Sequence, residues 1–351
     1  MLQEMLQQIS PLDSAAMETA RQHWDAIAKP LHSLGRLEDL VVQLAGITGT
    51  ANLPPRKKAV LIFCADNGVV AEGVTQTTQA VTAAVTRNFT MGIASVNALS
   101  RVCGADVFPV DIGVAEELHC DGIISRKIAA GTRNFAHEPA MTREQAERAI
   151  LTGIALVGEK VAAGYNLIIT GEMGIGNTTT SSAVAAVLLG QPVERMTGRG
   201  AGLSDEGLAR KVDAICRGIL RNEPDPTDPL DVLAKLGGFD LAGLCGVFLG
   251  GALEGVPVVM DGFISGVAAL CAVRLCPAAA KAVFASHCSS EPAARLVLDA
   301  LGKAPLLTAG LHLGEGTGAV ASLPLWDMAL AVYDHCYSFA EGGITPYTPQ
   351  C

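Results

Sequence analysis

The stretch from Asn166 to Ala183 reads Asn-Leu-Ile-Ile-Thr-Gly-Glu-Met-Gly-Ile-Gly-Asn-Thr-Thr-Thr-Ser-Ser-Ala. An apolar, β-branched run comes first, as in a buried strand, and glycines and then hydroxyl side chains follow it. This order predicts a strand, a tight turn and the start of a helix. Unpaired N–H groups at such a helix start suit a phosphate monoester, although an ordinary turn with helix caps would have the same pattern.

Two familiar nucleotide motifs do not fit this turn. Gly171 and Gly176 have the spacing of the P-loop that binds triphosphates, but Asn177 stands where that motif requires lysine. The dinucleotide fingerprint Gly-x-Gly-x-x-Gly fails because Thr179 occupies its last position. The turn therefore favours a single phosphate group.

Further apolar runs resemble the one at 166–170, and each ends in a polar or glycine-rich turn. They lie at 59–64, 105–110, 256–260 and 282–285. Helical spacing is found between the runs at 142–163, 181–189 and 205–220, and at the start of the chain at 14–27 and 34–44. This alternation predicts an α/β protein with a mostly parallel sheet wrapped by helices. Since parallel strands end at one edge of a sheet, their polar ends predict one composite site.

Composition and charge exclude several classes of protein. The 351 residues are 50% hydrophobic, which supports a large core and favours one large domain plus a small one. The formal charge of −10 leaves no basic surface for a nucleic acid. Glu254 and Asp261 interrupt the most apolar region, 241–273, so no run reaches the roughly 18 residues that a membrane span needs.

The beginning of the chain and the cysteines indicate a reducing compartment. Residues 1–10 lack the basic and apolar regions of a secretory signal, so we expect the protein in the cytoplasm. The ten cysteines, from Cys64 to Cys351, form no Cys-x-x-Cys pair and mostly lie in apolar stretches. We expect structural thiols rather than metal ligands or disulfides.

A second glycine-rich segment, 310–319, isolates one carboxylate, Glu315. Burial there would raise its pKa and make it a proton acceptor near neutral pH. A glutamate that caps a helix beginning near Thr317 explains the pattern equally well. The neighbouring His312 is typical of a core or surface histidine.

Other candidate residues carry weaker signals. The segment 198–203 with Arg199 and Lys211 offers flexible backbone and two cations for a phosphate. Asp261 and Asp66 follow predicted strands, where a carboxylate can bind a ribose hydroxyl or simply form a turn. The segment 286–291 contains Ser, His and Glu but lacks the nucleophile elbow of a hydrolase.

Taken together, these segments resemble the nicotinate-nucleotide:dimethylbenzimidazole phosphoribosyltransferase family. The resemblance runs in order over nearly the whole chain, and its motifs are 63–69, 73–82, 171–179, 197–203, 237–241, 260–264 and 313–318. It implies a doubly wound sheet in a large Rossmann-like domain, residues 53–322. A smaller helical domain, 1–52 plus 323–351, would be built from both termini. It also implies a homodimer that uses no metal and no cofactor.

The same resemblance implies a reaction at ribose C1′. Nicotinate would leave its mononucleotide, and a nitrogen of 5,6-dimethylbenzimidazole would replace it with inversion, giving α-ribazole 5′-phosphate. The family's motif makes Glu315 the base that removes the benzimidazole proton, and Glu172 a second carboxylate near the ribose.

By resemblance, the remaining site residues fall into three groups. Those expected at the phosphate are Gly174, Gly176, Asn177, Thr178, Thr179, Gly202 and Lys211. Those expected around the benzimidazole are Thr75, Gln79 and Leu313. Asp261 and Ser289 are expected at the ribose hydroxyls or the nicotinate.

Two alternative functions compete with this reading. A transferase that uses phosphoribosyl pyrophosphate would need Mg²⁺ and an acidic pair, so a chelator would stop it. A nucleotide-binding module without catalysis would not depend on Glu315 for any rate.

Overall fold

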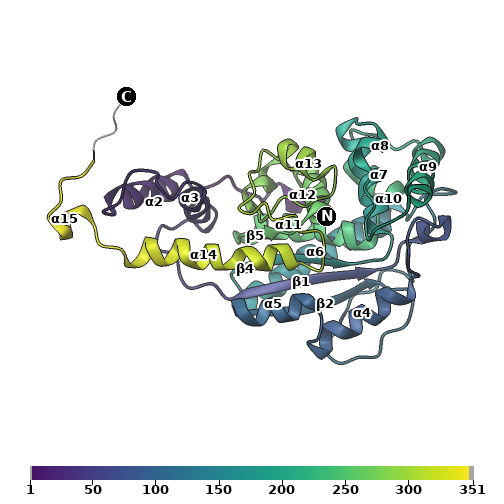
Figure 1. The fold of residues 1–351 in the computed structure, drawn as a ribbon, viewed down its shortest axis with the longest axis horizontal. Coiled ribbons are helices and arrows are strands. Elements are labelled where there is room, and N and C mark those ends of the chain that lie inside the picture. The colour runs from purple at the N-terminus through teal and green to yellow at the C-terminus, as the bar shows by residue number, and fades with distance from the viewer. Residues whose placement is uncertain (1, 348–351) are drawn as a thin grey trace.

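Six parallel strands form one sheet in the computed structural model, which describes residues 2–347 (Figure 1). The strands are β1 (Lys58–Ala65), β2 (Ala105–Gly113), β3 (Ile124–Ser125), β4 (Leu167–Met173), β5 (Val258–Met260) and β6 (Val283–Ala285). Their order across the sheet is β3-β2-β1-β4-β5-β6, and every neighbouring pair is parallel. The α/β class and the parallel sheet are therefore confirmed.

The strand order reverses at the centre of the sheet, between β1 and β4. Every residue of β1 is buried, and β1 pairs with β2 on one side and β4 on the other, with Lys58 opposite Ala105 and Leu167. A continuous apolar run suits such a strand because both of its faces are covered. Successive strands are added outward from β1 on one side and from β4 on the other. In sheets of this order, ligands bind beyond the strand ends at that switch point.

Helices cover both faces of the sheet, as expected for a doubly wound fold. The helices are α1 (Leu2–Leu6), α2 (Ser14–Ala26), α3 (Arg36–Thr48), α4 (Ala80–Met91), α5 (Ser95–Cys103), α6 (Arg143–Ala162), α7 (Asn177–Leu189), α8 (Val193–Met196), α9 (Asp205–Asn222), α10 (Pro229–Leu236), α11 (Phe239–Glu254), α12 (Phe263–Leu275), α13 (Ala294–Ala300), α14 (Thr317–His335) and α15 (Phe339–Gly342), with 3₁₀ turns η1 (Gly68–Glu72) and η2 (Pro277–Ala282). Helices α6, α11 and α12 lie on one face, and α4 and α5 lie on the other (Figure 1).

Glycines let α6 and α11 pack unusually closely. A Cβ on Gly153 of α6 would overlap the carbonyl oxygen of Gly243, and one on Gly246 of α11 would overlap that of Ile150. Part of the high glycine content therefore serves contact between helices rather than turns.

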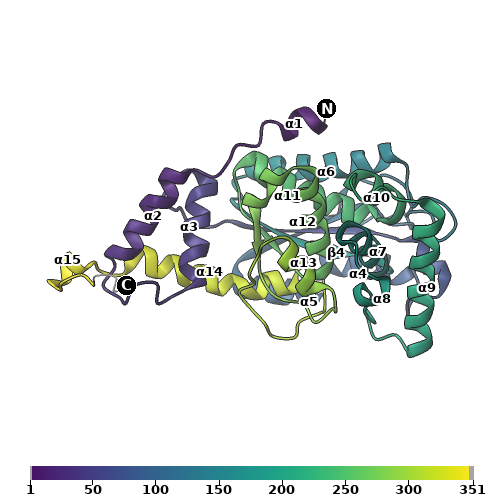
Figure 2. The ribbon, with the colours of Figure 1, turned by 90° about the horizontal axis from the view of Figure 1, so that it is seen from above.

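Segments from both ends of the chain meet at one end of the molecule (Figure 2). Helices α2, α3 and the second half of α14 pack there, with the rings of Trp24 and Tyr333 at 5.1 Å, and Ile27 forms a β-bridge with Ser338. Helix α1 lies apart from this group, against α11. Helix α14 is continuous from the sheet to the helical group. The domain boundaries at 52 and 323 therefore stay a prediction. Residues 348–351 of the predicted small domain lie outside the described residues.

Some predicted bounds differ from the observed ones. Helix α7 begins at Asn177 rather than Ser181, so the threonines that follow the turn belong to the helix itself.

Nine cysteines of the described residues are free thiols, whereas Cys351 lies outside that range. Across residues 2–347, no helix combines the length and the apolar character needed to cross a membrane.

Candidate active site

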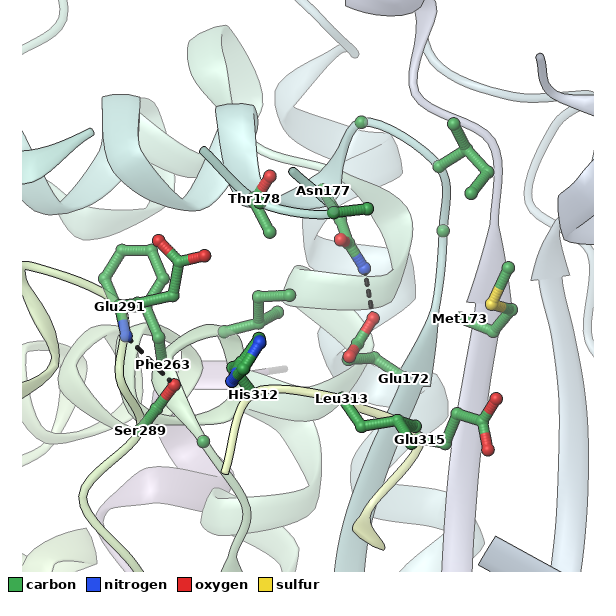
Figure 3. Close-up of a pocket in the computed structure, with 18 of the residues that line it drawn as sticks. Glu172, Met173, Asn177, Thr178, Phe263, Ser289, Glu291, His312, Leu313 and Glu315 are labelled. Carbon is green, nitrogen blue, oxygen red and sulfur yellow. Dashed lines mark hydrogen bonds between the residues drawn. The ribbon is translucent and has the colours of Figure 1, made fainter. Parts of the chain in front are cut away.

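A cavity of about 340 Å³ opens at the carboxyl edge of the sheet (Figure 3). Its size suits a small-molecule site. Its walls come from the ends of β4, β5 and β6, the first turn of α7, and the loops before α4, α9 and α14. Apolar side chains line part of it, including Val74, Val85, Met173, Phe263 and Leu313. The strand ends thus form one composite site, as the sequence pattern indicated.

The start of α7 and a buried lysine form a cationic end of this cavity. Gly176 precedes the helix with a φ of 94°, and Thr178 faces the cavity from the first turn. Lys211 of α9 is only 1% exposed, and its Nζ donates to Thr178 Oγ1 at 2.8 Å and to the Gly198 carbonyl at 3.0 Å. Burial lowers the pKa of Lys211 to about 8. Since an ammonium group has three N–H donors, one stays available for an anion.

Two buried carboxyl groups share one amide beside the α7 turn. Asn177 Nδ2 donates to Glu172 Oε2 and, at 3.1 Å, to Asp240 Oδ2 at the start of α11. Burial raises the pKa of Glu172 to about 8 and that of Asp240 to about 6. Glu172 is therefore largely protonated at neutral pH, and its carboxyl group can donate as well as accept a hydrogen bond.

The strained loop before α14 holds Glu315 against the cavity. Gly314, Glu315 and Gly316 all have positive φ values, 89°, 62° and 88°. A Cβ on Gly171 of β4 would come within 2.6 Å of the Glu315 carbonyl oxygen, so glycine is required where strand and loop meet. A non-glycine residue in this conformation is uncommon and costs free energy. This backbone conformation sets the position of the Glu315 carboxylate at the cavity wall.

The Glu315 carboxylate itself is half-buried. Its Oε2 accepts a long hydrogen bond of 3.4 Å from Val96 N in the first turn of α5. Burial raises its pKa, while the Val96 hydrogen bond opposes that shift. Within residues 2–347 this is the one hydrogen bond to the carboxylate, and the raised pKa makes the carboxylate a stronger proton acceptor than an exposed glutamate.

Asp261 has a role in building this loop. Its Oδ1 accepts from Ala319 N at 2.8 Å and its Oδ2 from Gly316 N at 3.2 Å, so the carboxylate caps the start of α14. Both oxygens are thus engaged with backbone. Asp261 lines the cavity, but its direct structural effect is to hold the loop that carries Glu315.

Most residues expected at the site lie around this one cavity. They are Thr75, Glu172, Gly174, Gly176, Asn177, Thr178, Lys211, Asp261, Ser289, Leu313 and Glu315. Ser289 also accepts a hydrogen bond from Glu291 N at 3.3 Å. The contacts of these residues with substrates stay predictions.

Three expected residues do not line the cavity. The helical turn of α7 places Thr179 inward, where it is fully buried, while Thr178 faces the cavity. The carbonyl of Gly202 accepts from the side chain of Gln76. Gln79 turns away and donates to the Asn67 carbonyl at 3.3 Å.

Sequence reasoning missed several side chains that the fold brings to the site. Phe263 and Glu291 line the cavity, and Asp240 accepts a hydrogen bond from the side chain of Asn177. Phe263 and Asp240 lie in the motifs 260–264 and 237–241, which could have drawn attention to them. His287 and Glu291 were considered only as part of a hydrolase triad, and both line the cavity.

Comparison with known proteins identifies the family of this chain. A family model described as phosphoribosyltransferase matches residues 9–344. The chain is 49% identical over 350 residues to the nicotinate-nucleotide–dimethylbenzimidazole phosphoribosyltransferase of Acetivibrio thermocellus, covering 100% of both proteins. The enzyme of the same name from Ruminiclostridium cellulolyticum is 47% identical and covers 99% of both. This chain belongs to the nicotinate-nucleotide–dimethylbenzimidazole phosphoribosyltransferase family.

The similarity of the fold to a solved structure also supports membership of this family. CobT from Thermus thermophilus matches with a TM-score of 0.90 and 41% identity, over 95% of this chain and 100% of that one. The family resemblance inferred from the sequence motifs is confirmed, and the chain is a phosphoribosyltransferase.

The raised pKa of Glu172 predicts how stability depends on pH. A folded pKa of about 8 lies above the ordinary value of 4.5, so between these values the native state holds a proton that the unfolded state has lost. Stability should therefore fall as pH rises from about 5 to 8, by at most about 1.4 kcal/mol per pH unit. Glu172→Gln should flatten this part of the profile, as measured by urea unfolding. An unchanged slope would contradict the assignment.

The two ends of α7 allow a matched test of the turn. Gly176 and Gly190 flank the helix with φ values of 94° and 59°, but a Cβ on Gly176 would lie 2.8 Å from Val70 Cγ2, whereas one on Gly190 meets nothing within 4 Å. We expect Gly190→Ala to cost about 1 kcal/mol. Gly176→Ala should cost more, and Gly176→Val should also abolish mononucleotide binding. If chemical denaturation shows that both alanine variants lose the same amount of unfolding free energy, the contact with Val70 has no role.

Proposed function

We propose that this enzyme transfers the 5-phosphoribosyl group of nicotinate mononucleotide to 5,6-dimethylbenzimidazole. The products are nicotinate and α-ribazole 5′-phosphate. The observation that carries the proposal is that Glu315 shares one cavity with the cationic end formed by Lys211 and Thr178. A phosphorylated sugar can bind at one end while an acceptor base meets a carboxylate at the other.

The chemistry requires one proton acceptor. Nicotinate leaves ribose C1′ from a cationic pyridinium nitrogen, so the bond breaks without protonation of the leaving group. One benzimidazole nitrogen forms the new bond to C1′ with inversion, and the proton on its other nitrogen must leave. Glu315 takes that proton, and its raised pKa makes its carboxylate a stronger proton acceptor than an exposed glutamate.

The positive charge that develops on the ribose needs a negative environment. Ionised Glu315 supplies it in a partly buried site, where charge interactions are stronger than in water. Glu172 stands beside the α7 turn, and burial favours its protonated form. The proposal therefore places the negative charge on Glu315, while neutral Glu172 can donate or accept a hydrogen bond near the ribose.

The acceptor base fits the apolar part of the cavity. Leu313 is 58% exposed to the cavity and solvent, immediately before the Glu315 loop (Figure 3). Val74, Val85 and Met173 provide further apolar surface for a flat ring. Covering these side chains with an aromatic base would remove apolar area from water.

A direct assay tests the proposal. The protein is incubated with nicotinate mononucleotide and dimethylbenzimidazole, and products are separated by chromatography. We expect free nicotinate and an α-ribotide in equal amounts. Appearance of neither product would reject the proposal. Activity that persists with a chelator would argue against a reaction that depends on Mg²⁺ and phosphoribosyl pyrophosphate.

We also propose a homodimer located in the cytoplasm. Apolar side chains remain exposed from the end of α4 to the end of α5, including Met91, Ile93 and Val102, which is 82% exposed. Helix α5 also provides the Val96 N–H that contacts Glu315. A second subunit covering these side chains would stabilise the dimer, and analytical ultracentrifugation would detect it.

A further inference from the structure

His287 is a buried histidine on the cavity wall that the proposed mechanism does not use. It follows β6, is 4% exposed, and lies beside Asp261 at the end of β5. Its ring packs against Gly318 in the first turn of α14, where a side chain would overlap it. Neighbouring elements thus fix the orientation of the ring.

The hydrogen bonds around His287 determine its tautomer. Ser286 Oγ lies 2.6 Å from the Met260 carbonyl oxygen, which can only accept, so the hydroxyl donates its single proton there. His287 Nδ1 lies 2.9 Å from the same Oγ and must therefore be the donor. Burial lowers the pKa of His287, which keeps the ring neutral. The neutral ring then carries its lone pair on Nε2.

Within residues 2–347, nothing hydrogen-bonds to Nε2. Asp261 does not compete for the ring, because its nearest oxygen is 4.0 Å from Nδ1 and both of its oxygens accept from the α14 backbone. Space in front of Nε2 is kept open by Gly262, where an added Cβ would stand 3.3 Å from that nitrogen. Nε2 is not among the buried side-chain atoms that lack a partner within residues 2–347, so it is reached from the cavity that His287 lines. An acceptor at the cavity wall can take a hydrogen bond from a ligand that donates one.

We infer that His287 Nε2 accepts a hydrogen bond from a ribose hydroxyl of the bound mononucleotide. This inference rests on the proposed function. The phosphate oxygens and the carboxylate of nicotinate mononucleotide are acceptors, which a neutral Nε2 would repel, whereas the ribose 2′- and 3′-hydroxyls are donors. His287 thereby distinguishes a ribosyl substrate from its deoxy analogue.

Binding measurements without the acceptor base test this inference separately from catalysis. Calorimetry compares nicotinate mononucleotide with its 2′-deoxy and 3′-deoxy analogues on the wild type, His287→Ala and His287→Gln. On the wild type, we expect one analogue to bind about 10-fold more weakly than the parent. His287→Ala should bind the parent about 10-fold more weakly and lose that discrimination. His287→Gln, whose side-chain oxygen can replace Nε2, should recover part of it.

His312 provides a matched control. It lines the same cavity but is exposed, and its Nδ1 lies 2.9 Å from the Gly310 carbonyl. His312→Ala should keep the discrimination between parent and deoxy analogue. The inference is overturned if His287→Ala, folded by circular dichroism, still discriminates fully, or if only His312→Ala loses it. A wild type that does not bind the parent at all would instead reject the proposed function.

Discussion

Glu315→Ala is expected to lower kcat by about 100-fold or more, while the Kd for nicotinate mononucleotide changes little. The variant lacks the group that takes the benzimidazole proton, but the cationic end at Lys211 and Thr178 is intact. Single-turnover kinetics and calorimetry measure the two quantities independently. The affinity should hold because Asp261, which the variant keeps, binds the backbone on the C-terminal side of Glu315 through Gly316 N and Ala319 N.

Glu315→Gln separates proton transfer from positioning. Glutamine keeps the size of the side chain and an oxygen that can accept from Val96 N, so a purely structural role would be restored. We expect Glu315→Gln to be as slow as Glu315→Ala. The wild-type rate should decrease as pH falls through the raised pKa of Glu315, and this limb should vanish in both variants. A glutamine variant with the wild-type rate would exclude the general-base role.

Lys211→Met should weaken binding of nicotinate mononucleotide by about 10- to 100-fold, the range for one charge-assisted hydrogen bond. Methionine fills similar volume at this buried position but removes the N–H donor and the positive charge. Because binding of an anion stabilises the ammonium form, wild-type affinity should also decrease as pH rises through the pKa of about 8.

A substrate without phosphate provides the control for this variant. Nicotinate riboside has no anion to meet Lys211, so the wild type and Lys211→Met should bind it equally. Dimethylbenzimidazole affinity should likewise be unchanged. If Lys211→Met weakened the riboside as much as the mononucleotide, the lysine would act by holding Thr178 and Gly198 in place rather than by contacting phosphate.

Local sequence was sufficient for five of the six strands and for the turn beside the site, whereas the short strand β3 was not predicted. The apolar runs at 59–64 and 166–170 predict buried strands because they are short, contain β-branched residues and end in polar or glycine-rich turns. Both are strands at the centre of the sheet. The glycines at 174 and 176 predict the tight turn, which the structure has between β4 and α7. Gly171 instead lies within β4, where its lack of a side chain makes room for the Glu315 carbonyl.

Finer assignments along α7 could not be made from residue types. Thr178 and Thr179 are adjacent and chemically alike, yet consecutive residues of a helix point about 100° apart. Only Thr178 faces the cavity. The sequence pattern of hydroxyls therefore identified the segment but not the residue within it.

What the sequence determined alone was local: where strands end, where glycine is needed, and that Glu315 is an isolated carboxylate. What only the tertiary structure decided was which distant groups share a hydrogen-bond donor or a helix end. Asp240 reaches Glu172 through Asn177, and Asp261 caps the helix that follows Glu315. These partners lie far apart in the chain and meet because of the strand order, which no local pattern encodes. Burial at that shared edge, rather than residue type, raises the pKa values on which the chemistry depends.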